Sequence, residues 1–192
     1  MIREVILTSV SSDGAAHLAP MGVHVLDGAM LVMPFRPSAT LDNILATRHA
    51  VMNQCDDVRV FAGCLTGRRD WPLMPADRIP GQRLAGALAH TELELARFED
   101  DQTRPRLYCR VVHEASHAPF RGFNRAQFSV LEAAILVSRL HMLPRSKIEA
   151  ELDYLRIGLD KTAGPAEREA WDWLMVKMEA YWSEHPRGES GQ

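Results

Sequence analysis

Two Asp-Gly dipeptides divide the first 35 residues into three short segments, and no other feature of the sequence restricts the fold as much. Asp13-Gly14 follows a segment rich in Val, Ile and Thr at 4–10, and Asp27-Gly28 separates segments 15–26 and 29–35. Asp-Gly between apolar runs is typical of the tight turns that join antiparallel strands. The start of the chain therefore predicts a three-stranded antiparallel meander. Pro20 lies inside the second segment, where it has no N–H to donate, so we expect that strand to be bulged or at an edge there.

Further along, the apolar pattern changes its period. Residues 84–98 and 107–112 alternate as strands do, whereas from residue 126 onward apolar residues recur at helical spacing. Residues 65–82 carry three prolines and no periodicity, which predicts a long loop. Strands first and helices last predict an α+β fold, a small antiparallel barrel with a C-terminal layer of about three helices. We place the boundary between 1–118, the barrel core, and 119–192, a helical extension packed on the barrel or on a dimer partner.

Composition excludes several classes of protein. The formal net charge is −3, without the excess of Lys and Arg that a nucleic-acid partner requires. The apolar run at 29–35 is far shorter than the roughly 20 residues that a membrane-spanning helix needs. Cys55, Cys64 and Cys109 form no CxxC pair, which favours buried free thiols in a reducing compartment. We therefore expect a soluble, cytoplasmic protein.

The segment His113-Glu114-Ala115-Ser116-His117 has the spacing of a zinc-protease motif, which works only on a helix. The preceding residues have a strand pattern, and Pro119 follows closely. Residues four apart on an extended chain are separated by about 13 Å, too far to share one zinc ion. We interpret the two histidines as surface or loop residues and predict no metal site.

A second group, Arg36, Ser38, Thr40 and Asn43, lies at the predicted start of a short helix. A guanidinium, two hydroxyls and free helix amides suit a phosphate, although an ordinary capped helix with a surface arginine would have the same residues.

Two further segments allow both a ligand and a purely structural interpretation. Ala19, Pro20, Met21 and Gly22 form a proline-interrupted strand that a planar ligand could approach, or a bulge at a barrel corner. Asn124 is a candidate N-cap for the first long helix. In the ligand interpretation, Arg125 beside it helps to bind an anion. In the structural interpretation, the segment is a hydrophobic connection and Asn124 only caps the helix.

Taken in order, several of these segments resemble one family. The segments E-x-I-x-T-S, D-G, A-P-M-G-V, F-R-P-S-A-T-L-D-N-I, V-M-N-Q-C-D-D and F-N-R-A-Q-F-S-V-L-E-A-A-I, over about residues 4–182, are similar to the family known as domain of unknown function 447. That family belongs to the FMN-binding split-barrel group, alongside flavin reductases and pyridoxamine-phosphate-oxidase-like proteins.

The resemblance implies an antiparallel split β-barrel that forms a homodimer and holds FMN near the subunit interface. It implies that Ala19, Pro20, Met21 and Gly22 line the isoalloxazine, and that the phosphate and ribityl end is bound by Arg36, Ser38, Thr40 and Asn43, with Asn53 nearby. Asn124 and Arg125 would complete the pocket, from the same or the other subunit. The family occurs in organisms with archaeal-type one-carbon cofactors, which suggests a pterin-linked redox role.

We therefore expect an FMN-dependent oxidoreductase whose electron donor and acceptor the sequence does not identify. No residue is assigned to acid–base catalysis. Three alternatives stay open: a flavin carrier or sensor without turnover, a barrel that has lost flavin and serves as an interaction module, and a disfavoured zinc hydrolase through the histidine motif.

Overall fold

The computed structural model describes residues 1–185, which form two compact units. Unit 1 consists of residues 1–56 and 70–121, and the described part of unit 2 consists of residues 57–69 and 122–185. Unit 1 is the β-barrel and unit 2 is a group of helices. The predicted α+β class, a barrel followed by helices, is confirmed.

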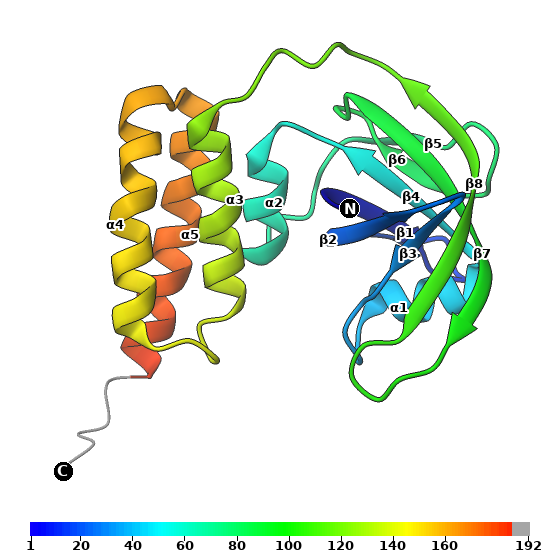
Figure 1. Ribbon diagram of the computed structural model, residues 1–192, viewed down its shortest axis with the longest axis horizontal. Coiled ribbons are helices and arrows are strands. Elements are labelled where there is room, and N and C mark those ends of the chain that lie inside the picture. Colours follow the sequence, from blue (N-terminus) through cyan, green and yellow to red (C-terminus); the bar gives the residue numbers. More distant parts are fainter. Residues whose placement is uncertain (186–192) are drawn as a thin grey trace. The chain divides into compact units, whose positions relative to one another are not determined.

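In the described part of unit 1, six antiparallel strands close into a barrel in the order β1-β2-β3-β8-β7-β4 (Figure 1). The strands are β1 (Ile2–Val10), β2 (Ala16–Leu26), β3 (Ala29–Val32), β4 (His49–Gln54), β7 (Ala89–Glu99) and β8 (Arg106–Ser116).

Both Asp-Gly dipeptides form the turns that the sequence predicts. Gly14 has a φ of +91° and Gly28 a φ of +72°, values that glycine adopts without the strain of a side chain. Asp27-Gly28 is a two-residue turn, because Leu26 of β2 pairs with Ala29 of β3.

The short strand β3 leaves the barrel partly split. It pairs only with residues 24–26 of β2 and residues 107–109 of β8, so the stretch 16–23 of β2 is paired on one side, with β1. Pro20 lies opposite Ile6 in a register that is continuous from Ile2 to Val10. There is accordingly no bulge at Pro20, and the strand is at an edge there, where a missing N–H costs no ladder hydrogen bond.

Apolar side chains from the strands and from helix α1 (Ala39–Thr47) fill the barrel. Leu41 and Ile44 of α1 share one core with strand residues, so α1 closes one end of the barrel (Figure 1). The fully buried members of this core include Val5, Leu7, Val23, Val32, Leu93, Leu95 and Leu107.

The segment predicted as a loop at 65–82 contains secondary structure. Strands β5 (Leu73–Pro75) and β6 (Gln82–Leu84) pair as a small antiparallel hairpin. Strands of three residues are too short to produce an alternating pattern, so the sequence does not reveal them.

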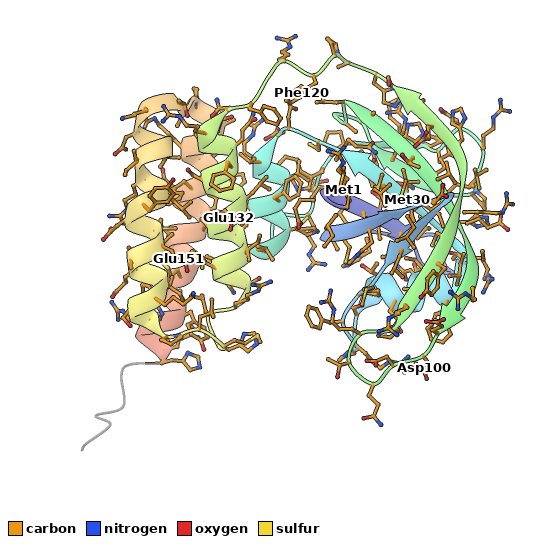
Figure 2. All side chains as sticks on the ribbon, in the orientation of Figure 1. Met1, Met30, Asp100, Phe120, Glu132 and Glu151 are labelled. Atoms are coloured by element: carbon orange, nitrogen blue, oxygen red, sulfur yellow. The ribbon has the colours of Figure 1, made fainter. Side chains whose placement is uncertain are left out.

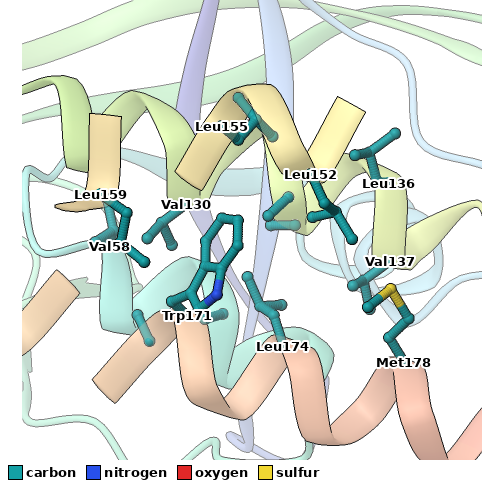
Figure 3. Close-up of a cluster of buried hydrophobic side chains, with 14 of the residues drawn as sticks. Val58, Val130, Leu136, Val137, Leu152, Leu155, Leu159, Trp171, Leu174 and Met178 are labelled. Atoms are coloured by element: carbon teal, nitrogen blue, oxygen red, sulfur yellow. The ribbon is translucent and has the colours of Figure 1, made fainter. Parts of the chain in front are cut away.

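Unit 2 contains helices α2 (Val58–Leu65), α3 (Arg125–Ser138), α4 (Arg145–Thr162) and α5 (Pro165–Glu184). Trp171 and Leu174 of α5, Val130 of α3 and Leu152 of α4 meet in its core (Figure 3). Val58 and Ala62 of α2 belong to the same core. Residues 57–69, which lie within the predicted barrel segment 1–118, belong to unit 2, because the apolar side of α2 packs on α3 and α5.

Among the helices of residues 1–185, none combines the length and apolar character needed to cross a membrane.

We predict that Leu174→Ala lowers the free energy of unfolding by about 2–5 kcal/mol, because it removes a fully buried side chain from the core of unit 2. Urea denaturation followed by circular dichroism measures the change. The matched control Val176→Ala, on the exposed side of the same helix, should stay within about 0.5 kcal/mol. Equal effects of the two substitutions would contradict the assigned packing of α5.

Candidate functional site

The start of α1 carries the group of residues predicted to bind a phosphate. Ser38 caps the helix in an extended conformation (φ −158°, ψ 142°), and its Oγ accepts a hydrogen bond from the Leu41 amide at 3.3 Å. The Asp42 amide donates to the Ser38 carbonyl. The amides of Ala39 and Thr40 lie in the first turn, where the helix has no carbonyl to accept from them. They are therefore available to a ligand or to water. Together with the positive end of the helix dipole, they favour an anion.

Arg36 lies next to this helix start but contacts another segment. Its guanidinium forms an ion pair with Asp100 at 2.6 Å, on the turn between β7 and β8 where Asp100 is labelled in Figure 2. The side chain of Arg36 is 41% exposed and that of Asp100 68% exposed. An exposed pair of this kind contributes little to stability, so Arg36 can turn to a phosphate at small cost.

Thr40 and Asn43 are buried on the barrel side of α1. The Asn43 Nδ2 donates to the Ser9 Oγ of β1 at 3.0 Å, which ties the helix to the strand. Through this contact and the shared core, β1 sets the position of the helix start.

The predicted flavin strand, Ala19 to Gly22, is the half-buried edge stretch of β2. Met21 packs against the core that contains Leu41, so this stretch and α1 belong to one region of unit 1. In an antiparallel strand, the N–H and C=O groups of successive residues point alternately to one side and to the other. Every second residue of this stretch therefore points its backbone groups away from β1. A Cβ at Gly22 would lie 3.1 Å from Ile2 Cγ2 and 3.2 Å from Glu4 Oε1. The glycine therefore makes room for side chains of β1, a structural reason that the sequence does not reveal.

Asn53 is fully buried, and its side-chain amide forms hydrogen bonds within the barrel unit. Its Nδ2 donates to the Ile6 carbonyl at 2.9 Å and to the Thr8 Oγ1 at 2.8 Å, and its Oδ1 accepts from the Leu84 amide at 2.7 Å. Asn53 thereby joins β4, β1 and β6. This structural role is separate from the predicted position near the cofactor.

Asn124 and Arg125 lie in unit 2, at the start of α3. Asn124 is the N-cap, as predicted, with its Oδ1 accepting from the Ala126 amide at 2.7 Å. Its Nδ2 donates to the Thr162 carbonyl at the end of α4. Arg125 lines a hollow between α3 and α4 with Ser129 and Gly158. These two residues are thus described within the helical unit, whereas the other predicted residues lie in the barrel unit.

A further group of polar residues in unit 1 is absent from the sequence prediction. Asp77, His90, Glu92 and His113, here called the His–carboxylate cluster, offer ligand atoms that all lie within 4.8 Å of one another. His113 lies on β8, so the strand predicted there continues through the histidine motif, and His117 directly follows it. Of the two histidines interpreted as surface or loop residues, His117 is exposed, whereas His113 is half-buried with its Nε2 3.2 Å from Asp77 Oδ2. His90 and Glu92 occupy alternate positions of a predicted strand, so the sequence indicates that their side chains share one face. Nothing in the sequence indicates that His113 lies beside them.

Hydrogen bonds determine the charge of Glu92. Burial alone would raise the pKa of Glu92, but hydrogen bonds from the Asp77 amide, from His90 and from the amides of Ile79 and Arg78 outweigh burial and lower this pKa. Burial, assisted by the charges of Arg83 and His90, lowers the pKa of His117. Glu92 is therefore an anion and His117 a neutral ring at neutral pH.

Two family models match the sequence. The N-terminal domain of a protein of unknown function, DUF447, matches residues 3–118, and the DUF447 C-terminal domain matches residues 124–176. No curated protein is significantly similar to the chain in sequence.

Solved structures share the fold. An FMN-bound DUF447 protein from Methanosarcina mazei is 17% identical, with a TM-score of 0.79, and the match covers 92% of this chain and 94% of that one. Component B of nitrilotriacetate monooxygenase from Bacillus cereus is 19% identical, with a TM-score of 0.51 over 60% of this chain and 70% of that one. An FMN-binding protein from Thermus thermophilus with bound 1-cyclohex-2-enone is 16% identical, with a TM-score of 0.51 over 60% of this chain and 71% of that one.

We predict that Asn53→Ala destabilises the protein by about 1–3 kcal/mol or more, because it leaves the buried Leu84 amide and Ile6 carbonyl without their partner. Urea denaturation of the protein without added cofactor measures this loss. The control Gln102→Ala removes an exposed amide on the β7–β8 turn and should change little. If Asn53→Ala were as stable as the control, the structural role would be refuted.

Proposed function

The chain belongs to the DUF447 protein family, and from this membership we propose that it binds FMN and acts as an FMN-dependent oxidoreductase. The observation that carries the proposal is the start of α1, with a serine cap and amides that favour an anion. The similar protein from Methanosarcina mazei, which holds FMN, supports it, since the two chains share their fold over nearly their whole length.

The residues at this helix start fit the phosphate of FMN. The amides of Ala39 and Thr40 would donate to the phosphate oxygens, as helix starts do in many phosphate sites. The Ser38 and Thr40 hydroxyls would add neutral hydrogen bonds, and Arg36 would leave Asp100 to add a charge-assisted one. Asn43, which anchors α1 to β1, would hold the helix start in position.

The edge stretch of β2 fits the isoalloxazine. Ala19 to Gly22 are half-buried, and Pro20 offers an apolar ring without an N–H. Free backbone groups on this edge would hydrogen-bond the polar rim of the ring, while Met21 would contact its apolar part. Bound FMN supplies hydride and single-electron transfer, and the chain contributes binding, orientation and the exclusion of water.

We further propose that the protein is a cytoplasmic homodimer with FMN near the subunit interface, Asn124 and Arg125 completing the pocket. The buried thiols of Cys64 and Cys109, which form no disulfide, suit a reducing compartment. For the redox partner we propose a small molecule, with a reduced pterin as the first candidate. Light scattering coupled to size-exclusion chromatography tests the dimer, and a monomeric mass with FMN bound would refute it.

A flavin carrier without turnover is the second candidate function, because the residues proposed to hold FMN at the helix start and along Ala19 to Gly22 include no carboxylate, imidazole or thiol. Stopped-flow mixing with NADH, NADPH or a reduced pterin separates the two. Reduction of the bound flavin within catalytic times supports the enzyme, and no reduction by any of the three supports the carrier.

We predict that the purified protein is yellow, with the absorption bands of oxidised FMN at one equivalent per chain. Arg36→Ala should weaken FMN binding about ten- to a hundredfold, because it removes a charge-assisted hydrogen bond worth about 1.5–3 kcal/mol. Thr40→Ala should weaken it less, by about tenfold. Fluorescence titration of the apoprotein with FMN measures both affinities.

Thr47→Ala, a threonine at the far end of the same helix, is the matched control and should bind FMN like the parent protein. Riboflavin, which lacks the phosphate, should bind the parent and Arg36→Ala equally. Unchanged FMN affinity in both Arg36→Ala and Thr40→Ala would exclude this phosphate site, and a colourless protein that takes up no FMN would exclude the proposed function.

A further inference from the structure

The His–carboxylate cluster lies on the side of strands β7 and β8 that faces away from the barrel core. Leu93 and Leu95 of β7 point into the core, so the alternate residues His90 and Glu92 point the other way. On β8, Val112 is left unpaired by the register shift, which places His113 opposite Glu92. Glu92 pairs directly with His113 on β8, so their side chains share one face, and His90 lies two residues earlier on that same face.

The β5–β6 hairpin covers this outer face. Asp77 lies in the connection between its two strands, and the amides of Arg78 and Ile79 donate to the Glu92 Oε2, both at 2.9 Å. Glu92 thus holds the connection against β7, which brings the Asp77 carboxylate to the two histidines.

The four ligand atoms all lie within 4.8 Å of one another, and several of the distances between them are close to those of a metal site. His90 Nε2 lies 3.1 Å from Glu92 Oε1 and 3.7 Å from Asp77 Oδ2, and His113 Nε2 lies 3.2 Å from Asp77 Oδ2. In a tetrahedral zinc site with bonds of about 2.0–2.2 Å, neighbouring ligand atoms are about 3.3–3.6 Å apart. Small side-chain movements therefore suffice to accommodate an ion.

We propose that Asp77, His90, Glu92 and His113 bind one divalent transition-metal ion, with Zn²⁺ as the best match. Two imidazoles and two carboxylates are nitrogen and oxygen donors suited to Zn²⁺, and the two negative charges balance the ion. The site is accessible from one side, since the side chains of Asp77 and His113 are 43% and 28% exposed while those of His90 and Glu92 are fully buried.

A second layer of contacts orients these ligands. His90 Nδ1 lies 2.8 Å from His117 Nε2, and the two rings are parallel within 5° with centroids 5.0 Å apart, so they meet edge to edge. A metal ion on His90 Nε2 would leave the proton of that ring on Nδ1, which would donate to His117 Nε2, and His117 would then carry its own proton on Nδ1. An imidazole ligand that donates its other N–H to a neighbour is typical of zinc sites.

The same contacts also form a plain hydrogen-bond network without an ion, and this alternative makes different predictions. In the network, a proton on His90 Nε2 forms the hydrogen bond to Glu92 Oε1. In the metal site, His90 Nε2 carries no proton because it binds the ion. A network has no reason to take up Zn²⁺ at one ion per chain. The metal site also stands apart from the proposed function, because none of its four ligands is among the residues proposed to hold FMN.

Isothermal titration of the chelator-treated full chain with Zn²⁺ tests the proposal. We expect saturation at one ion per chain and a higher thermal unfolding temperature with Zn²⁺ present. His113→Ala and Asp77→Asn should both abolish this stoichiometric binding, and circular dichroism should show both variants folded, since these two ligands are partly exposed. His117→Ala, which removes the partner of His90, should weaken binding about 10- to 100-fold.

His141→Ala is the matched control, because it removes an exposed imidazole from the α3–α4 connection in unit 2. It should bind Zn²⁺ like the parent chain. Absence of Zn²⁺ binding by the parent would overturn the proposal, and so would binding that folded His113→Ala and Asp77→Asn retain in full. FMN binding is measured on the same samples, so a failed zinc site and a failed flavin site are told apart.

Discussion

Strand pairing around the barrel is the constraint on which the rest of unit 1 depends. Every buried backbone amide and carbonyl needs a partner, and a closed barrel supplies one to each strand. Here closure depends on β3, which has four residues while its neighbours β2 and β8 have eleven each. The stretch of β2 beyond β3 is consequently an edge inside an otherwise closed barrel. That edge tolerates Pro20, and it offers backbone groups to a flat ligand close to the helix that closes the barrel end.

Local chemistry made part of this structure predictable from the sequence. The turns at Gly14 and Gly28, the serine cap of α1 and the Asn124 cap of α3 each depend on residues within a few positions of one another. Such features can be predicted from the sequence because the interactions that stabilise them join residues close together in the chain. The barrel followed by a helical layer was predictable for the same reason, since apolar residues recur at helical spacing from residue 126 onward.

Long-range pairing accounts for what the sequence did not reveal. Helix α2 looks like any short amphipathic helix, and only its packing on α3 and α5 assigns it to unit 2. His90 and His113 are 23 positions apart, and the register of β7 with β8, including its shift after Glu92, brings them together. The roles of Asn53 and Gly22 are likewise set by neighbours on other strands. The sequence indicated the helix start at Ser38, but not the ion pair between Arg36 and Asp100.

The assignment of α2 to the helical unit has a consequence for how the protein is made. Residues 58–65 are synthesised before the barrel strands β7 and β8 and well before α3, α4 and α5. The apolar side chains Val58 and Ala62 therefore have no helical partners until the last third of the chain is synthesised. During that interval the nascent chain exposes an amphipathic helix, which is a natural target for chaperones that bind exposed apolar segments. Expression of residues 1–118 alone would make this exposure permanent.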